Sequence, residues 1–118
     1  MTVRAARLAA RALARSANGT PPAGTARFSG YGLLSLAVES GDVFAFRHYG
    51  TSSLGLPFNA VWHRDPAGCW TVHVDVSPGR SSAPFFAPAV ADVRTGDIAV
   101  RWRGRNELSV CVDRKSVV

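Results

Sequence analysis

The chain is poor in the residue types on which several classes of function depend. It has two cysteines, Cys69 and Cys111, which are too few for a disulfide framework and lack the spacing of a zinc site. One disulfide bridge and two free thiols both remain open. No apolar run approaches the roughly 20 residues that span a bilayer, so no transmembrane segment is expected. The sequence also lacks paired carboxylates, a phosphate-binding loop and a nucleophile elbow. We therefore expect a cytoplasmic protein without a cofactor and lean against an enzyme.

Acidic residues are absent from the first 27 positions, which carry five arginines. Residues 28–118 carry eight arginines and one lysine against eight acids, so their net charge is only +1 of the formal +6. The high charge therefore belongs mainly to the first segment. A basic tail attracts polyanions without sequence preference, so no specific nucleic-acid partner is expected.

The first segment also differs from the rest in its pattern. Its arginines follow a helical spacing on an alanine-rich background, and residues 18–25 form a linker that contains Gly and Pro. The sequence predicts a basic leader over residues 1–27 that is flexible or partly helical, with a targeting role left open. One β-domain over residues 28–118 follows it.

The most informative stretch is residues 59–76, because it contains a strong turn signal. Asp65 can accept from backbone amides, Pro66 has its φ preset, and Gly68 suits the left-handed conformation that closes a short hairpin. A one-residue bulge at Gly68 then sets Asp65 opposite Cys69. Counting outward from the turn gives two faces. The apolar face holds Phe58, Ala60, Trp62, Trp70, Val72, Val74 and Val76, and the polar face holds Asn59, His63, Thr71, His73 and Asp75 with Val61 among them.

Alternation of period two predicts further strands, which bring the total to about seven. They are residues 31–39, 43–49, 90–94, 97–103 and 107–113. Thr95 and Gly96 predict a hairpin between the third and fourth of these. Phe85 and Phe86, bounded by prolines, predict an edge segment or a flap.

The connections between these strands are short, which leaves no room for a parallel crossover. The sequence therefore predicts an all-β fold, an antiparallel meander that forms a small or incomplete barrel or a sandwich. Its likeness to lipocalin or calycin barrels is one of architecture only. An open sheet edge would offer a pairing surface for a second copy.

The polar face of the central hairpin carries the first candidate site. In the derived register His63 and His73 are diagonal neighbours and Asp75 lies one step further along, close enough to share a metal ion or a proton. These three residues are weak candidates for metal ligands or for acid–base catalysis. Such residues are also ordinary on a strand face that meets water.

Aromatic residues form the second candidate site. Lined up inside a barrel, they would make an apolar cavity for a lipid, a pigment or another flat ligand. Packing into the core is the simpler alternative. The predicted ligand-binding set is Phe44, Phe46, Phe58, Trp62, Trp70 and Trp102, with Phe85 and Phe86 as further members.

The sequence gives weaker support to the remaining candidate sites. Arg101 and Arg103 share the outer face of a strand while Trp102 points inward, so charge and stacking do not share one surface as single-strand nucleic-acid binding requires. The available nucleophiles, residues 81–82 and Cys69, sit in no recognisable catalytic motif.

These patterns together predict a non-catalytic, small barrel-like module that binds a small apolar molecule. One alternative is an enzyme or metal-binding protein that uses His63, His73 and Asp75. Another is an interaction domain that pairs through a sheet edge, as in a homo-oligomer. Carrier and enzyme differ in which face of the central hairpin is enclosed.

Overall fold

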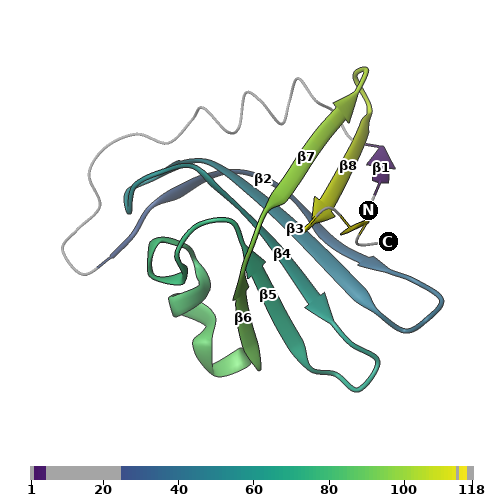
Figure 1. Ribbon diagram of the computed structural model, residues 1–118, viewed down its shortest axis with the longest axis horizontal. Helices are drawn as coiled ribbons and strands as arrows, with labels where there is room; N and C mark the ends of the chain where they lie inside the picture. Colours follow the sequence, from purple (N-terminus) through teal and green to yellow (C-terminus); the bar gives the residue numbers. More distant parts are fainter. Residues whose placement is uncertain (1, 5–24, 114, 117–118) are drawn as a thin grey trace.

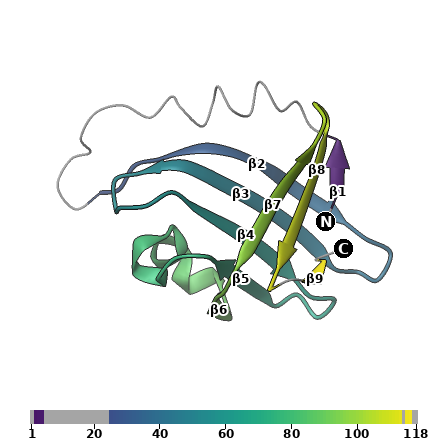
Figure 2. The ribbon, with the colours of Figure 1, turned by 45° about the horizontal axis from the view of Figure 1, so that its top comes forward.

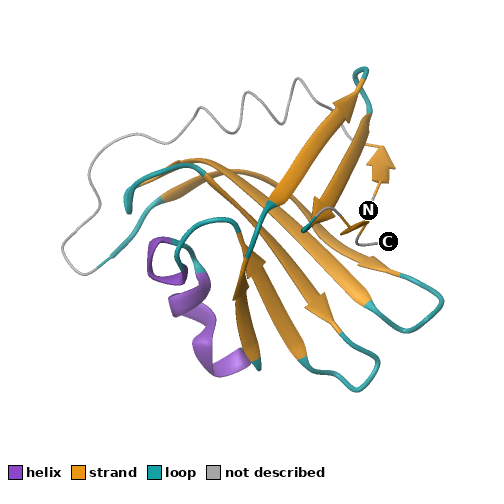
Figure 3. Ribbon diagram, viewed as in Figure 1, coloured by secondary structure: helices purple, strands orange, loops and turns teal. Residues whose placement is uncertain are grey.

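The computed structural model describes residues 2–4, 25–113 and 115–116, and these are mostly β-structure (Figures 1 and 3). They form two sheets in which antiparallel pairing dominates, and the sheets do not close into a barrel. The described residues contain nine strands, where the sequence predicted about seven. The prediction of a β-rich antiparallel fold is confirmed.

The larger sheet has five strands in the order β2-β3-β4-β5-β6. Its strands are β2 (Phe28–Ala37), β3 (Val43–Ser52), β4 (Phe58–Arg64), β5 (Trp70–Val74) and β6 (Asp92–Thr95). The first four run antiparallel to their neighbours as a meander, because each connection is a short turn or loop.

The smaller sheet is built around β8, which pairs with all three of its other strands. Its members are β1 (Thr2–Arg4), β7 (Ile98–Arg103), β8 (Glu107–Val112) and β9 (Lys115–Ser116). Thr2–Arg4 is therefore strand rather than the flexible or helical leader that we predicted. Residues 5–24, on which the rest of that prediction falls, lie outside the described residues.

The central hairpin has the predicted register, in which Trp62 lies opposite Val72 and Val61 opposite His73. Its turn is held as the residue types indicate. The Asp65 N–H donates to the Cys69 carbonyl (3.0 Å), and the Asp65 carboxylate accepts from the Cys69 N–H (2.9 Å). Gly68 has a φ of +91°, the left-handed conformation that a glycine adopts without strain.

The predicted hairpin of residues 90–94 with 97–103 is wrong. Strand β6 pairs in parallel with β5, with Val72 opposite Val93, and β7 pairs with β8 in the other sheet. The parallel crossover that we had excluded is supplied by two short 3₁₀ segments, η1 (Pro78–Arg80) and η2 (Ala83–Ala89). Tight 3₁₀ turns accept prolines in the first turn, so this Pro-rich stretch forms a compact connection rather than a strand.

The β7–β8 hairpin lies across the larger sheet, while η1 and η2 lie near β5 and β6 (Figure 2). Leu108 and Val110 of β8 pack on Phe44, Phe46 and Val61 and form the first buried core. The second core lies on the opposite face of the larger sheet and contains Phe58, Ala60, Val72 and Val74. Both faces of the central hairpin are therefore covered, each by a different element.

Strands β2, β6 and β7 each have a neighbour on one side only among the described strands. Pairing of such an edge with another chain stays a prediction. Both cysteines are free thiols, Cys69 on the exposed hairpin turn and Cys111 on β8. Within the described part of the chain, no helix has the length and apolar character needed to cross a membrane.

Candidate functional site

One face of the larger sheet carries two groups of aromatic rings, which together we call the aromatic face. It consists of Phe28, Tyr49, Phe58, Trp62 and Trp70. Phe58 contacts Tyr49 and Phe28 with ring centroids 4.7 and 5.5 Å apart, and Trp62 meets the edge of Trp70 at 6.0 Å. Tilted and edge-to-face pairs of this kind are favourable arrangements for aromatic rings.

Segment η2 lies against this face and adds two rings to it. Phe85 meets Phe28 at 6.1 Å, and Phe86 meets Trp62 edge-on at 5.2 Å. Both phenylalanines nevertheless remain 55% and 47% exposed. Each ring therefore touches the aromatic face on one side and meets water on the other.

A buried serine holds this segment in place. The Ser81 hydroxyl donates to the Pro78 carbonyl (2.7 Å) and accepts from the Ala83 N–H (3.1 Å). Ser81 is completely buried, and Ser82 is nearly so. Because both hydrogen-bonding roles of the Ser81 hydroxyl are taken up locally, this residue stabilises the turn into η2 and is not placed as a nucleophile.

The structure divides the predicted ligand-binding set between two sites. Phe58, Trp62 and Trp70 lie on the aromatic face, together with Phe85 and Phe86 from η2. Phe44, Phe46 and Trp102 belong instead to the core between the larger sheet and the β7–β8 hairpin. These six residues therefore do not line a single cavity.

The opposite face carries all three histidines, and we call it the imidazole face. On it, Asp75, Asn59 and His48 form a hydrogen-bonded line that runs from the residue after β5 across β4 to β3. The Asp75 carboxylate accepts from the Asn59 backbone N–H (2.7 Å) and side-chain amide (2.8 Å), and the Asn59 side-chain oxygen lies 2.7 Å from His48 Nδ1.

This line fixes which ring nitrogen of the neutral His48 imidazole carries the proton. An ionised carboxylate only accepts hydrogen bonds, so Asp75 holds the NH₂ group of Asn59 toward itself and turns the amide oxygen toward His48. His48 Nδ1 must then carry the proton that it donates to that oxygen. In the neutral ring the lone pair is left on Nε2, the arrangement that a general base requires.

His63 makes a separate pair with the turn between β2 and β3. Its Nε2 lies 2.6 Å from the Asp42 carboxylate, and its ring stacks on Phe44 at 4.7 Å. Hydrogen bonds from the Ser40 hydroxyl, and then from His63, hold the pKa of Asp42 below its usual value. The Asp42 carboxylate therefore stays charged and orients the His63 ring.

His73 is half-buried and lies beside Arg94 of β6. Burial lowers its pKa, and the positive charges of Arg94 and His63 lower it further. His63, His73 and Asp75 thus have three different surroundings, although they share one face. No group of three or more potential ligands among the described residues is placed to hold a metal ion.

Two members of the His48 line were not among the predicted site residues. His48 and Asn59 are opposite each other on β3 and β4, and residues 53–57 connect these strands. No tight-turn signal in that loop fixes the register between them, so the sequence did not bring the pair together. Asp42 lies between the predicted strands of residues 31–39 and 43–49, and its contact with His63 of β4 depends on the same register.

Comparisons of the chain with protein-family models, with curated proteins and with solved structures found no match. The site must therefore be interpreted from its own geometry.

Proposed function

We propose that this chain is a non-catalytic module that binds a small, neutral, apolar molecule on the aromatic face beside η2. The observation that carries this proposal is the pair of half-exposed rings, Phe85 and Phe86, on a segment held against an aromatic floor. A flat ligand lying along these rings and Trp70 would cover apolar surface that now meets water. The likeness to lipocalin-type carriers, a curved antiparallel sheet with an apolar binding face, is part of this proposal.

The free energy gained by covering Phe85 and Phe86 is large enough for weak-to-moderate binding of a small molecule. Fully burying a phenylalanine side chain stabilises by about 1.5–3 kcal/mol, so covering the exposed halves of two rings yields the same roughly 1.5–3 kcal/mol from the protein side. The ligand's own apolar surface adds to this value. Binding of small molecules in mostly apolar sites with few polar groups follows the same pattern.

A titration with the neutral dye Nile red tests the proposal. We expect saturable fluorescence enhancement with one dye per chain, and about three- to tenfold weakening in Phe86→Ala, since covering half of one ring contributes roughly 0.7–1.5 kcal/mol and each 1.4 kcal/mol is tenfold in Kd. Trp102→Phe is the matched control because Trp102 lies on the other side of the larger sheet. The proposal fails if Nile red does not bind, or if Phe86→Ala binds as well as the wild type.

A second candidate function rests on the line from Asp75 through Asn59 to His48. A histidine whose Nδ1–H is held by an oriented acceptor presents Nε2 as a base or nucleophile. We propose this position, rather than His63 or His73, as the reactive imidazole if the protein catalyses a reaction. His63 is less suited because Asp42 occupies its Nε2.

Hydrolysis of p-nitrophenyl acetate, a general substrate for reactive imidazoles, tests this second candidate. The expected result is a rate above that of the same concentration of free imidazole. His48→Gln should abolish the excess and Asn59→Leu should reduce it, while His63→Gln leaves it unchanged. An excess rate that survives in His48→Gln would rule out this role for His48.

A further inference from the structure

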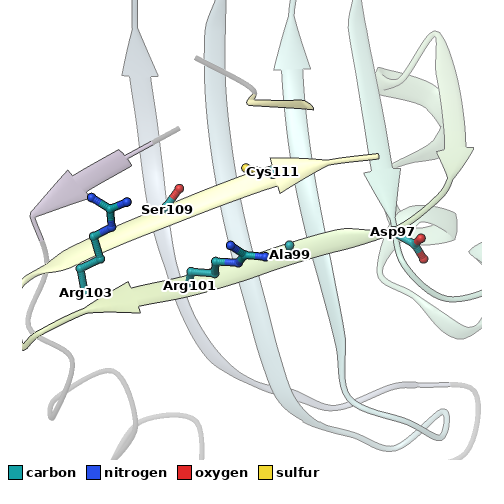
Figure 4. Close-up of a pocket in the computed structure, with 6 residues that line it drawn as sticks. All are labelled: Asp97, Ala99, Arg101, Arg103, Ser109 and Cys111. Atoms are coloured by element: carbon teal, nitrogen blue, oxygen red, sulfur yellow. The ribbon is translucent and has the colours of Figure 1, made fainter. Parts of the chain in front are cut away.

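The outer face of the β7–β8 hairpin, turned away from the larger sheet, is hollowed (Figure 4). The hollow has a volume of about 610 Å³, which is in the range of small-molecule sites. Six residues line it. They are Asp97, which directly precedes β7, then Ala99, Arg101 and Arg103 of β7, and Ser109 and Cys111 of β8. None of them belongs to the aromatic face or to the His48 line.

Among the six lining residues, the two arginines lie at one end and Asp97 lies at the other, while Glu107 lies opposite Arg103 outside the lining. Arg101 and Arg103 are two residues apart on one strand, so their side chains leave the same face. Both are exposed, and neither takes part in an ion pair among the described residues. Asp97 lies four positions from Arg101, about 13 Å along an extended strand, which exceeds the screening length of roughly 8–10 Å at physiological salt.

The remaining lining residues suit an organic ligand. Ser109 lies directly opposite Arg101 and adds a hydroxyl to the lining of the hollow. Ala99 and Cys111 are also paired across the strands and form a small apolar floor between the arginine end and Asp97. The hollow therefore offers donors for an anionic head at one end and apolar contact for a short body next to it.

We propose that this hollow is a binding site for a small organic anion, a carboxylate or phosphate head on a short apolar body. Arg101 and Arg103 hold the head, Ser109 donates a hydrogen bond to it, and the body lies over Ala99 and Cys111. This site is independent of the aromatic face, where the proposed ligand is neutral.

The thiol of Cys111 makes the hollow measurable. In a Cys69→Ser background it is the single thiol of the chain. The Cys111 thiolate attacks the disulfide of 5,5′-dithiobis(2-nitrobenzoate), so that a protein–reagent disulfide forms and one thionitrobenzoate leaves. This reagent is an aromatic dicarboxylate and matches the proposed ligand, whereas 4,4′-dithiodipyridine undergoes the same exchange without a carboxylate.

The ratio of the two rate constants, anionic over neutral reagent, is the quantity to measure. We expect the Arg101→Gln/Arg103→Gln variant to lower this ratio by about tenfold at low salt, because the local cationic pair is lost. The matched control, Arg64→Gln/Arg105→Gln, removes the same net charge from exposed positions outside the hollow and should change the ratio by less than about twofold. Equal reductions in both variants would show an effect of overall charge and would overturn the proposal.

Competition in the Cys69→Ser protein gives a test that needs no change to the hollow. Benzoate or phenyl phosphate should slow the anionic reagent in a saturable way, and the more effective of the two identifies the preferred head. Inorganic phosphate, which lacks the apolar body, should protect less. Absence of protection by both organic anions at tens of millimolar would also overturn the proposal.

Discussion

At the scale of single residues, Gly30 is held under the tightest steric constraint in the larger sheet. It lies at a register irregularity of β2, where the strand approaches β3 closely. A Cβ at this position would overlap the carbonyl oxygen of His48, which is backbone and cannot rotate away. The absence of a side chain at Gly30 therefore allows β2 to pair beside the histidine of the imidazole face.

The substitution Gly30→Ala should lower the free energy of unfolding by about 3 kcal/mol, since overpacking against backbone forces the strands apart. Gly79→Ala is the matched control, because no atom lies within 4 Å of a Cβ there. That control should change stability by no more than about 0.5 kcal/mol. Urea unfolding of both variants checks the difference, and similar values for the two would contradict the close approach of β2 and β3.

Val61 is the residue at which the sequence pattern was hardest to interpret. It falls among polar side chains on the hairpin, yet it is completely buried because β8 packs over it. The alternation along β4 therefore predicted the register correctly but did not predict that Val61 is buried. A face that appears polar in one hairpin becomes partly core when a distant hairpin covers it.

Paired substitutions of valine and threonine test this burial. Val61→Thr should destabilise by about 2 kcal/mol, because the hydroxyl enters a dry contact between the sheets. Thr51→Val should be neutral or stabilising by up to about 1 kcal/mol, since the buried Thr51 hydroxyl has no hydrogen-bond partner within the described residues. Thermal unfolding measures both, and a tolerated Val61→Thr would show that the imidazole face is open to water.

At the scale of elements, local turn chemistry decided what could be predicted. The β4–β5 hairpin follows from residues 65–68 alone, because a tight turn fixes the register of the strands that it joins. The parallel β5–β6 pair was missed because its connection folds into 3₁₀ segments that carry no periodic signal. The same limit explains why Trp62 and Trp102 were predicted to line one cavity although they lie on different sides of the larger sheet. Neither hairpin's sequence indicates which face of the sheet the hairpin covers.

The β5–β6 pair also sets a pH dependence, because it places Arg94 beside His73. Burial, Arg94 and His63 lower the pKa of His73, while Asp113 and Asp92 act in the opposite direction. The unfolded chain then binds a proton at the ordinary value near 6.5 more readily than the folded chain does. The contribution of His73 to stability is therefore lost as the pH falls through that value.

We expect the free energy of unfolding to fall between about pH 7 and pH 5, and His73→Gln to remove part of this slope. Arg94→Gln should flatten it less, because burial is the larger cause of the lowered pKa. Urea unfolding at pH 5, 6, 7 and 8 measures the slopes. A slope unchanged by His73→Gln would show that the group titrates alike in both states.

At the scale of the whole molecule, the larger sheet separates two kinds of chemistry. The β7–β8 hairpin packs on the imidazole face, and η2 packs on the aromatic face, so each face is covered by a different element. The apolar residues of η2 are more exposed than those of the β7–β8 hairpin. Phe85 and Phe86 are about half exposed, whereas Leu108 and Val110 are buried. The ligand binding that we propose for the aromatic face is the central claim that this arrangement supports.

The three indole N–H signals in a ¹H–¹⁵N NMR spectrum test it most directly. Trp62 and Trp70 lie on the aromatic face, whereas the Trp102 indole donates to the Tyr31 hydroxyl on the other side of the sheet. With signals assigned from Trp→Phe variants, titration with neutral 2-naphthol should shift Trp62 and Trp70 in a saturable way and leave Trp102 in place. Three unmoved signals, or a shift confined to Trp102, would contradict ligand binding on this face.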